Sequence, residues 1–211
     1  MNIEITQLGR SQVDATAELL ANAFSEDPIY RYLFPESERS RANNIRSLFK
    51  LVVIYSQPFD RIYTTTGTLQ GIAAWEPPKH SRPNLLQLLP LVLALPFQIG
   101  WRNTRRISMA FSKAEELRNR NMSQPHWYLI VLGVLSNYQG QGIGGRLLEP
   151  VLKQADLEGY PCYLETSTEG AVRFYQRHGF EVIATERLLE NAPLLWMMKR
   201  EPKNSRENQE H

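Results

Sequence analysis

The 211-residue sequence contains only one cysteine, Cys162, and this excludes an internal disulfide framework. Chains without disulfides are typical of reducing compartments, so we expect a cytoplasmic location. Cys162 stands in an apolar, strand-like run, where a buried structural thiol is expected rather than a nucleophile. The first ten residues also lack the basic-then-apolar pattern of a signal peptide.

Neither sign of charge is in strong excess. The 24 Lys and Arg residues nearly balance the 22 Asp and Glu residues, for a net charge of +2. This balance does not indicate a nucleic-acid partner, and we interpret the basic cluster of Arg102, Arg105 and Arg106 as a solvated helix face. With 42% hydrophobic residues, the composition is that of a soluble globular protein with one full core.

The sequence has no long, uninterrupted apolar run. Its most apolar stretch, residues 84–101, is divided by Pro90 and Pro96 and interrupted by Gln87 and Gln98. A helix needs about 20 predominantly apolar residues to span a bilayer. The stretch therefore predicts short buried or pocket-lining helices and no membrane span.

Metal-ligand spacing and a P-loop are also missing. The four histidines are His80, His126, His178 and His211, and their spacing predicts no metal site. No Gly-Lys-Ser/Thr sequence occurs, which excludes a P-loop on pattern.

What the sequence does contain is an alternation of strand and helix patterns over residues 1–200, which predicts a single α/β domain. Strands are expected at residues 3–5, 126–135, 161–165, 180–188 and 194–199, with a hairpin over 61–75. Helices are expected at residues 11–24, 36–54, 144–158 and 170–178, with a polar helix ending near 120. Residues 29–35 are expected to be irregular and Gly179 to be a left-handed helix cap. The polar tail, residues 201–211, is expected to be disordered.

Four glycines lie between a buried strand and an amphipathic helix, at Gly140, Gly142, Gly144 and Gly145. Glycine lets backbone amides approach an anion without interference from Cβ. The helix amino terminus that follows adds unpaired N–H groups and a partial positive charge. The turn therefore predicts a pyrophosphate-binding site.

A dinucleotide-binding fold is the rival interpretation. Gly140, Gly142 and Gly145 satisfy G-x-G-x-x-G, and Glu165 ends the next strand as a ribose-binding acid would. Against it, Ser136–Gln139 separate the strand from the motif. Only about 30 residues then remain between Glu165 and the last predicted strand, whereas a dinucleotide fold continues with several βα units.

Two sequence blocks resemble a known family. QGQGIG, residues 139–144, matches the Q/R-x-x-G-x-G/A signature of the GNAT superfamily of N-acetyltransferases. LETSTEGAVRFYQRHGF, residues 164–180, resembles that family's strand–helix element ending in a tyrosine and a Gly-Phe pair. AFSEDP, WEPP, HWYL and LETS together look like the branch that contains puromycin N-acetyltransferase.

The resemblance implies the acyl-CoA N-acyltransferase fold, a mixed central sheet that splays open and is flanked by helices. The opening would lie between the strands at 126–135 and 161–165, and acetyl-CoA would enter it as the acyl donor, with a CoA-binding core at about 126–180. The residues implied for cofactor binding are Leu132, Gly133, Val134, Gln139, Gly140, Gln141, Gly142, Ile143, Gly144, Gly145, Thr168 and Tyr175. Thr168 stands where many family members carry asparagine, and Arg146 could add positive charge.

The chemistry of acetyl transfer from a thioester needs a neutral amine, a stabilised oxyanion and a protonated leaving thiolate. Tyr175 matches the family's general acid, and a backbone amide near Val134 would hold the oxyanion. The general base stays open between Glu165 and His126, with Glu26, Asp27 and Glu76 as further candidates and water as a relay.

The acceptor is expected across the sheet from CoA, at a site drawn from Asp27, Tyr30, Tyr32 and Trp75. This lining favours the primary amine of a small molecule. Two alternatives remain, a protein amino-terminal or lysine acetyltransferase and a CoA-binding protein without turnover. The sequence also leaves a homodimer open.

Overall fold

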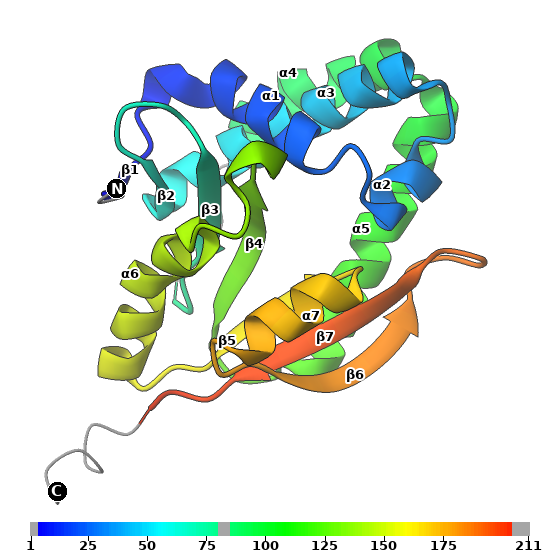
Figure 1. Cartoon of the computed structure of the whole chain (residues 1–211). Coiled ribbons are helices and arrows are strands. Elements are labelled where there is room, and N and C mark those ends of the chain that lie inside the picture. The colour runs from blue at the N-terminus through cyan, green and yellow to red at the C-terminus, as the bar shows by residue number, and fades with distance from the viewer. Residues whose placement is uncertain (1–3, 80–84, 204–211) are drawn as a thin grey trace, which may run out of the picture.

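The computed structural model describes residues 4–79 and 85–203, which form a seven-stranded sheet flanked by helices (Figure 1). The sheet order is β1-β2-β3-β4-β5-β7-β6, and only the β4–β5 pair is parallel. The strands are β1 (Ile5–Gln7), β2 (Ile62–Thr65), β3 (Gly71–Glu76), β4 (Trp127–Val134), β5 (Cys162–Thr166), β6 (Glu181–Arg187) and β7 (Leu194–Arg200). The mixed sheet predicted from the sequence is confirmed.

Helices cover both faces of the sheet. They are α1 (Val13–Ala23), α2 (Pro28–Leu33), α3 (Glu38–Ser56), α4 (Leu85–Ile99), α5 (Trp101–Asn121), α6 (Ile143–Glu158) and α7 (Glu169–Gln176), with short 3-10 turns at Arg10–Gln12, Gln57–Phe59 and Ser136–Tyr138. One buried cluster joins α1 and α3 to the sheet through side chains such as Leu20 and Phe49. The other joins α6 to the opposite face, where Leu147 and Val151 pack with Trp127.

The two parallel strands at the centre separate almost at once. β4 and β5 pair only at Trp127 with Cys162 and at Tyr128 with Tyr163. Beyond Tyr128, β4 follows β3 while β5 follows β7, and the ribbons of β4 and β5 diverge in Figure 1. This is the splay that the sequence resemblance implies.

A β-bulge lies on the part of β4 that borders the opening. Ala74 pairs with Val131 and Trp75 pairs with Leu129, so Ile130 has no partner in this register. A bulge bends the strand and changes which groups it presents. Here it changes the direction of β4 beside the opening.

Residues 29–35 were predicted to be irregular, and this is wrong for most of them. The structure has helix α2 at Pro28–Leu33. The Asp27 side chain accepts a hydrogen bond of 2.8 Å from the Ile29 amide, and Pro28 occupies the first helical position. Asp followed by Pro is a helix start signal, because the carboxylate caps and the proline ring presets φ.

The prediction of separate short helices over residues 84–101 is also wrong. The single helix α4 runs from Leu85 to Ile99 through both Pro90 and Pro96. Each internal proline removes a backbone hydrogen bond. Burial of Leu95 and Ile99 in the core that includes α3 offsets this cost. Among the helices of the described ranges, none has the length and apolar character needed to cross a membrane.

At the carboxyl end, Gly179 follows α7 with a φ of +85°, as predicted for a left-handed cap. Arg200, only 4% exposed, donates two hydrogen bonds of 2.8 and 2.7 Å to Asp156 on α6. This ion pair connects α6, which packs on β2–β4, to β7 on the other side of the splay. Ile3 and tail residues 204–211 lie outside the described residues.

Candidate functional site

The glycine turn that follows β4 has an open backbone. Gly140 and Gly142 have φ values of +76° and +79°, and a Cβ built at either position would meet no atom within 4 Å. Gly142 is the N-cap of α6, so the first amides of that helix have no intrahelical partners. The Gln139 side chain donates a 3.0 Å hydrogen bond to the Val134 carbonyl and ties the turn to the strand end.

The other two glycines serve packing. A Cβ on Gly144 would lie 3.0 Å from the Phe174 ring, and a Cβ on Gly145 would lie 2.7 Å from Nε2 of His178. Glycine at these positions lets the start of α6 approach α7 closely. Nδ1 of His178 lies 2.9 Å from the Phe174 carbonyl, at the helix end where a capping role was expected.

A large cavity of about 1290 Å³ lies between α6 and α7 and includes the glycine turn. Its lining includes five basic side chains, from Arg146, Lys153, Arg177, Arg200 and Lys203, against two acidic ones, from Glu149 and Asp156. The cofactor residues implied by the resemblance that line it are Leu132, Val134, Gln139, Gly140, Gly142, Ile143, Gly144, Gly145, Thr168 and Tyr175. A long anionic ligand fits this shape and charge.

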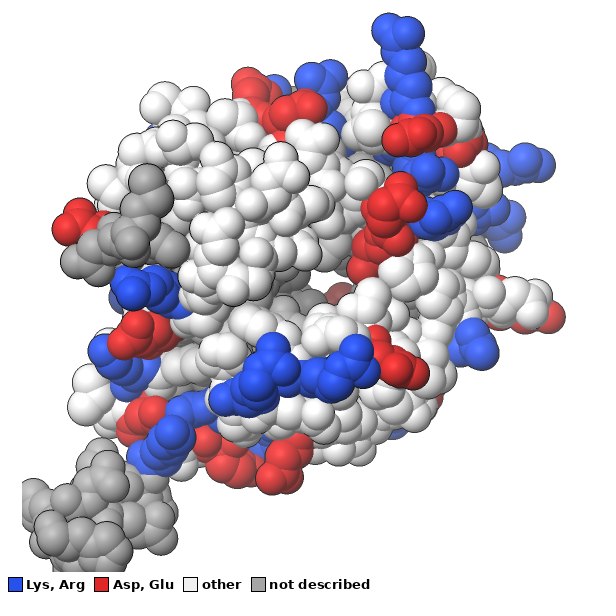
Figure 2. Space-filling model, viewed as in Figure 1, with Lys and Arg blue, Asp and Glu red and all other residues white. Residues whose placement is uncertain are grey.

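A smaller cavity of about 400 Å³ lies over the splay itself. β4 residues 129–134 form one wall, and Glu165 to Thr168 form the facing wall. Figure 2 shows a hollow in the middle of this face of the molecule, bordered by the α1–α2 region and by α7. Gly133 lines this cavity rather than the larger one, and Gln141 lines neither.

Tyr175 lies where the two cavities meet and contributes to the lining of both. Its ring packs against Phe174 and Phe180 at centroid distances of 5.1 and 5.7 Å, and the residue is 7% exposed. Burial raises the pKa of Tyr175 well above its ordinary value, so its hydroxyl stays protonated. It can therefore donate a proton or a hydrogen bond to a group bound at the junction.

Glu165 lies on the wall of the smaller cavity. Burial raises its pKa from 4.5 to about 7, and the Tyr128 and Tyr163 hydroxyls and then Arg118 oppose that rise. Oε1 of Glu165 has no hydrogen-bond partner among the described residues. A carboxyl that titrates near neutrality and has an unpartnered oxygen can accept a proton from a bound molecule.

Arg118 and Tyr128 both interact with the Glu165 carboxyl and oppose the rise that burial causes in its pKa. The sequence analysis did not single out either of them. The Arg118 guanidinium lies 3.4 Å from Glu76 Oε2 and 4.5 Å from the centre of the Tyr128 ring. No local signal marks Arg118, because it is one of several arginines on a polar helix. Tyr128 belongs to the HWYL block and could have been found from its position beside the splay.

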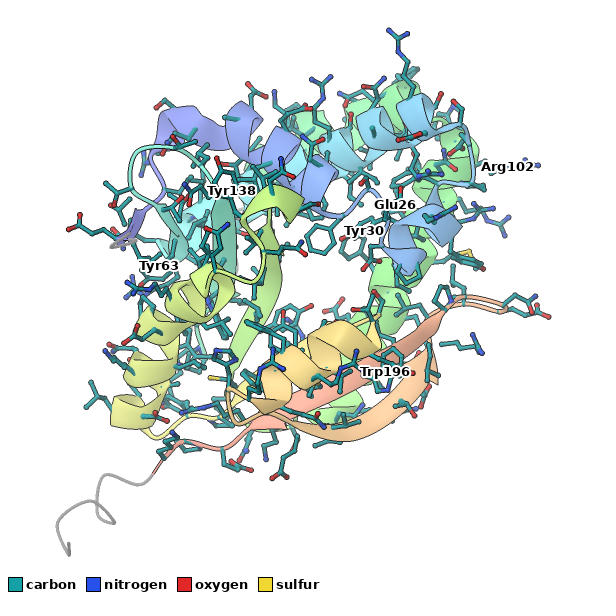
Figure 3. All side chains as sticks on the ribbon, viewed as in Figure 1. Glu26, Tyr30, Tyr63, Arg102, Tyr138 and Trp196 are labelled. Atoms are coloured by element: carbon teal, nitrogen blue, oxygen red, sulfur yellow. The ribbon has the colours of Figure 1, made fainter. Side chains whose placement is uncertain are left out.

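The α1–α2 loop also borders the smaller cavity. Ser167 donates a 2.6 Å hydrogen bond to Asp27 Oδ2, joining segments 140 positions apart in the chain. Tyr30, which also borders this cavity, packs against Phe24 and Phe49 and extends from α2 toward β4 (Figure 3). Asp27 and Tyr30 therefore line the cavity as proposed for an acceptor site.

Neither cavity is lined by four other candidate site residues, which are Trp75, Tyr32, His126 and Glu76. Trp75 is fully buried in the cluster under α6, because it lies on the sheet face opposite α1 and α3. The Tyr32 hydroxyl donates a 2.7 Å hydrogen bond to the Glu190 carbonyl in the β6–β7 connection. Nδ1 of His126 lies 2.8 Å from the Gln124 carbonyl, and burial lowers the pKa of His126.

Residues 99–180 match the family described as Acetyltransferase (GNAT) family. An uncharacterized N-acetyltransferase of Schizosaccharomyces pombe is 27% identical over 171 residues, covering 78% of this chain and 68% of that protein. A probable serine/threonine-protein kinase of Dictyostelium discoideum is 25% identical over 199 residues, covering 86% of this chain. The chain spans only 21% of that longer relative.

Solved structures share the fold. The crystal structure described as histone acetyltransferase HPA2 and related acetyltransferase from Corynebacterium glutamicum has a TM-score of 0.69 and 20% identity, covering 96% of this chain and 98% of that chain. Polyamine N-acetyltransferase of Drosophila melanogaster has a TM-score of 0.63 and 18% identity, covering 95% of this chain and 100% of that chain. At these identities the likeness shows the fold alone.

The raised pKa of Glu165 predicts a pH-dependent effect of Glu165→Gln on stability. The folded-state pKa lies above the unfolded one, so ionisation destabilises the wild-type protein as the pH rises from 4.5 through 7. The variant has no carboxyl at this position, so its stability does not fall in this way. Urea unfolding should show its stability relative to wild type rising by about 2–3 kcal/mol across that window. A difference that is constant with pH would mean that Glu165 titrates as an ordinary carboxyl.

Proposed function

We propose that this chain, whose residues 99–180 match the GNAT family of acetyltransferases, transfers the acetyl group of acetyl-CoA to the primary amine of a small molecule. The transfer is direct, within a complex that holds both substrates. One observation carries the proposal. A basic, glycine-lined cavity and a smaller cavity meet at Tyr175 across the opening between β4 and β5.

The large cavity fits CoA in shape and charge. The free amides at the start of α6 and the side chain of Arg146 suit the pyrophosphate. The β4 edge at Leu132–Val134 suits the pantetheine arm, whose amides can pair with that edge as an added strand would. Thr168 caps α7 by accepting a 3.2 Å hydrogen bond from the Ala171 amide. Its hydroxyl hydrogen remains available where many family members place asparagine.

Different residues around the smaller cavity accept and donate the protons of the reaction. Glu165 accepts the proton that the attacking amine loses, directly or through water, since its pKa lies near 7. A backbone amide of β4 near Val134 stabilises the negative charge that develops on the carbonyl oxygen. The Tyr175 hydroxyl gives a proton to the sulfur as the C–S bond breaks. Acetyl-CoA supplies the activated acyl group. Solvent then takes the proton from Glu165 and returns one to Tyr175, which restores both groups.

The modest volume of the smaller cavity supports a small acceptor rather than a protein chain. Asp27 with Ser167 and Tyr32 with Glu190 form two connections across the acceptor side. The first of these lies on the wall of the smaller cavity, where an extended peptide would have to displace it. A cavity of about 400 Å³ matches a small amine, and the Drosophila neighbour is named for the acetylation of such amines.

Gly142→Ala is expected to weaken acetyl-CoA binding, because a side chain at positive φ displaces the amides of the turn. The KM for acetyl-CoA should rise about tenfold, equal to about 1.4 kcal/mol of binding free energy. Gly159→Ala is the matched control, since Gly159 caps the other end of α6 with a φ of +71° and an equally open surrounding. Equal KM values for the two variants would remove the turn from the cofactor site.

Tyr175→Phe is expected to lower kcat about a hundredfold, the contribution typical of one general acid. The Kd for CoA, measured by calorimetry, should change little because only the hydroxyl is lost. Tyr160→Phe is the control, a tyrosine near Lys79 that lines neither cavity. Wild-type turnover in Tyr175→Phe would make Tyr175 a packing residue.

A further inference from the structure

Helix α4 and the start of α5 expose an unusual set of large apolar side chains. They are Leu89, Val92, Leu93, Phe97 and Trp101, with exposed fractions of 47%, 46%, 62%, 83% and 72%. We call these five residues the α4–α5 apolar surface. Single exposed apolar residues are ordinary, whereas a contiguous group indicates contact with another surface.

The group is contiguous because of how the two helices join. Leu89, Leu93 and Phe97 follow one another at four-residue spacing on one side of α4. Gly100, with a φ of +83°, turns the chain into α5, and the Phe97 and Trp101 rings meet edge to face at 6.2 Å. The surface therefore continues across the turn.

The opposite side of α4 already serves the core. Leu95 and Ile99 are 7% and 5% exposed and belong to the cluster shared with α3. The helix is therefore apolar on both sides, and only one side is covered by this chain. Helices of this composition are normally buried all round.

The charges on the segment that carries the surface are of one sign. Residues 85–112 contain three arginines, Arg102, Arg105 and Arg106, and no aspartate or glutamate. Arg106 donates to the carbonyls of Tyr32 and Leu33. Arg102 and Arg105 are exposed next to Trp101, and Arg102 points away from the molecule in Figure 3. The acidic neighbour that contacts this region, Glu36, is held by Asn103 at 2.6 Å on the buried side of α5.

We propose that the α4–α5 apolar surface docks on the anionic face of a phospholipid bilayer. Helix α4 would lie in the plane of the interface, its apolar side among the acyl chains and Arg102 and Arg105 against the phosphates. A second copy of this chain fits less well, because a twofold contact brings the same arginines together without a carboxylate from this surface. The proposal does not depend on acetyl transfer.

The test is co-sedimentation of the full chain with two kinds of vesicle, phosphatidylcholine alone and phosphatidylcholine mixed with phosphatidylserine. The chain should bind the anionic vesicles much more strongly, and added salt should weaken that binding by screening. Circular dichroism checks that each variant is folded.

Two paired variants separate the apolar and the charged contributions. Phe97→Ser with Trp101→Ser should abolish binding to both vesicles. Arg102→Gln with Arg105→Gln should reduce binding to the anionic vesicles about tenfold and leave the neutral vesicles unaffected. Leu157→Ser is the control, because Leu157 is 78% exposed on α6, outside the surface; it should bind as wild type does.

Either of two results would overturn the proposal. One is a folded wild-type chain that sediments with neither vesicle. The other is a wild-type dimer in analytical ultracentrifugation that the Phe97→Ser, Trp101→Ser variant converts to a monomer, since the surface would then be covered by a second copy.

Discussion

Strands β4 and β5 run parallel but share only two register positions, and the rest of the site depends on this short pairing. From Leu129 onward, β4 keeps β3 as a neighbour and leaves its other edge facing the smaller cavity. Such an edge offers N–H and C=O groups that need partners. The two halves also stay together through side-chain contacts, including Arg200 with Asp156 and Asp27 with Ser167. These contacts therefore hold the two halves of the sheet together around the opening.

Burial in this opening suits two side chains to the opposite roles proposed for them. It raises the pKa of the Glu165 carboxyl to about 7, where that group can take a proton in a neutral solution. It raises the pKa of the Tyr175 phenol further above neutrality, where that group remains a donor. Tyr128, Tyr163 and Arg118 limit the first shift and keep Glu165 from becoming a permanently neutral acid. One physical cause thus supports both the proposed base and the proposed acid, and both line the smaller cavity.

The sequence predicted those parts of the structure that rest on local patterns. The glycine turn was predictable because backbone conformation and helix starts follow from neighbouring residues. The position of Tyr175 on the cavity lining was predictable because it belongs to a motif of fixed spacing. The fold class followed from the order of strands and helices, and the splay from resemblance to a family with the same two motifs.

The errors came from interactions that a linear pattern does not carry. Tertiary burial kept α4 continuous through Pro90 and Pro96 against their local preference. Trp75 looked like cavity lining, but its place on the strand turns it into the core under α6. The partnership of Asp27 with Ser167 joins segments 140 positions apart, and only the folded chain shows it.

The measurement that tests the central claim most directly is thermal unfolding with saturating acetyl-CoA, CoA or NAD. A ligand present at about 100 times its Kd stabilises the fold by about 2.7 kcal/mol. Our account predicts a rise in Tm with acetyl-CoA and with CoA, and no change with NAD. A rise with NAD, or no rise with the two CoA compounds, would contradict the assignment of the glycine turn and of the cavity beside it.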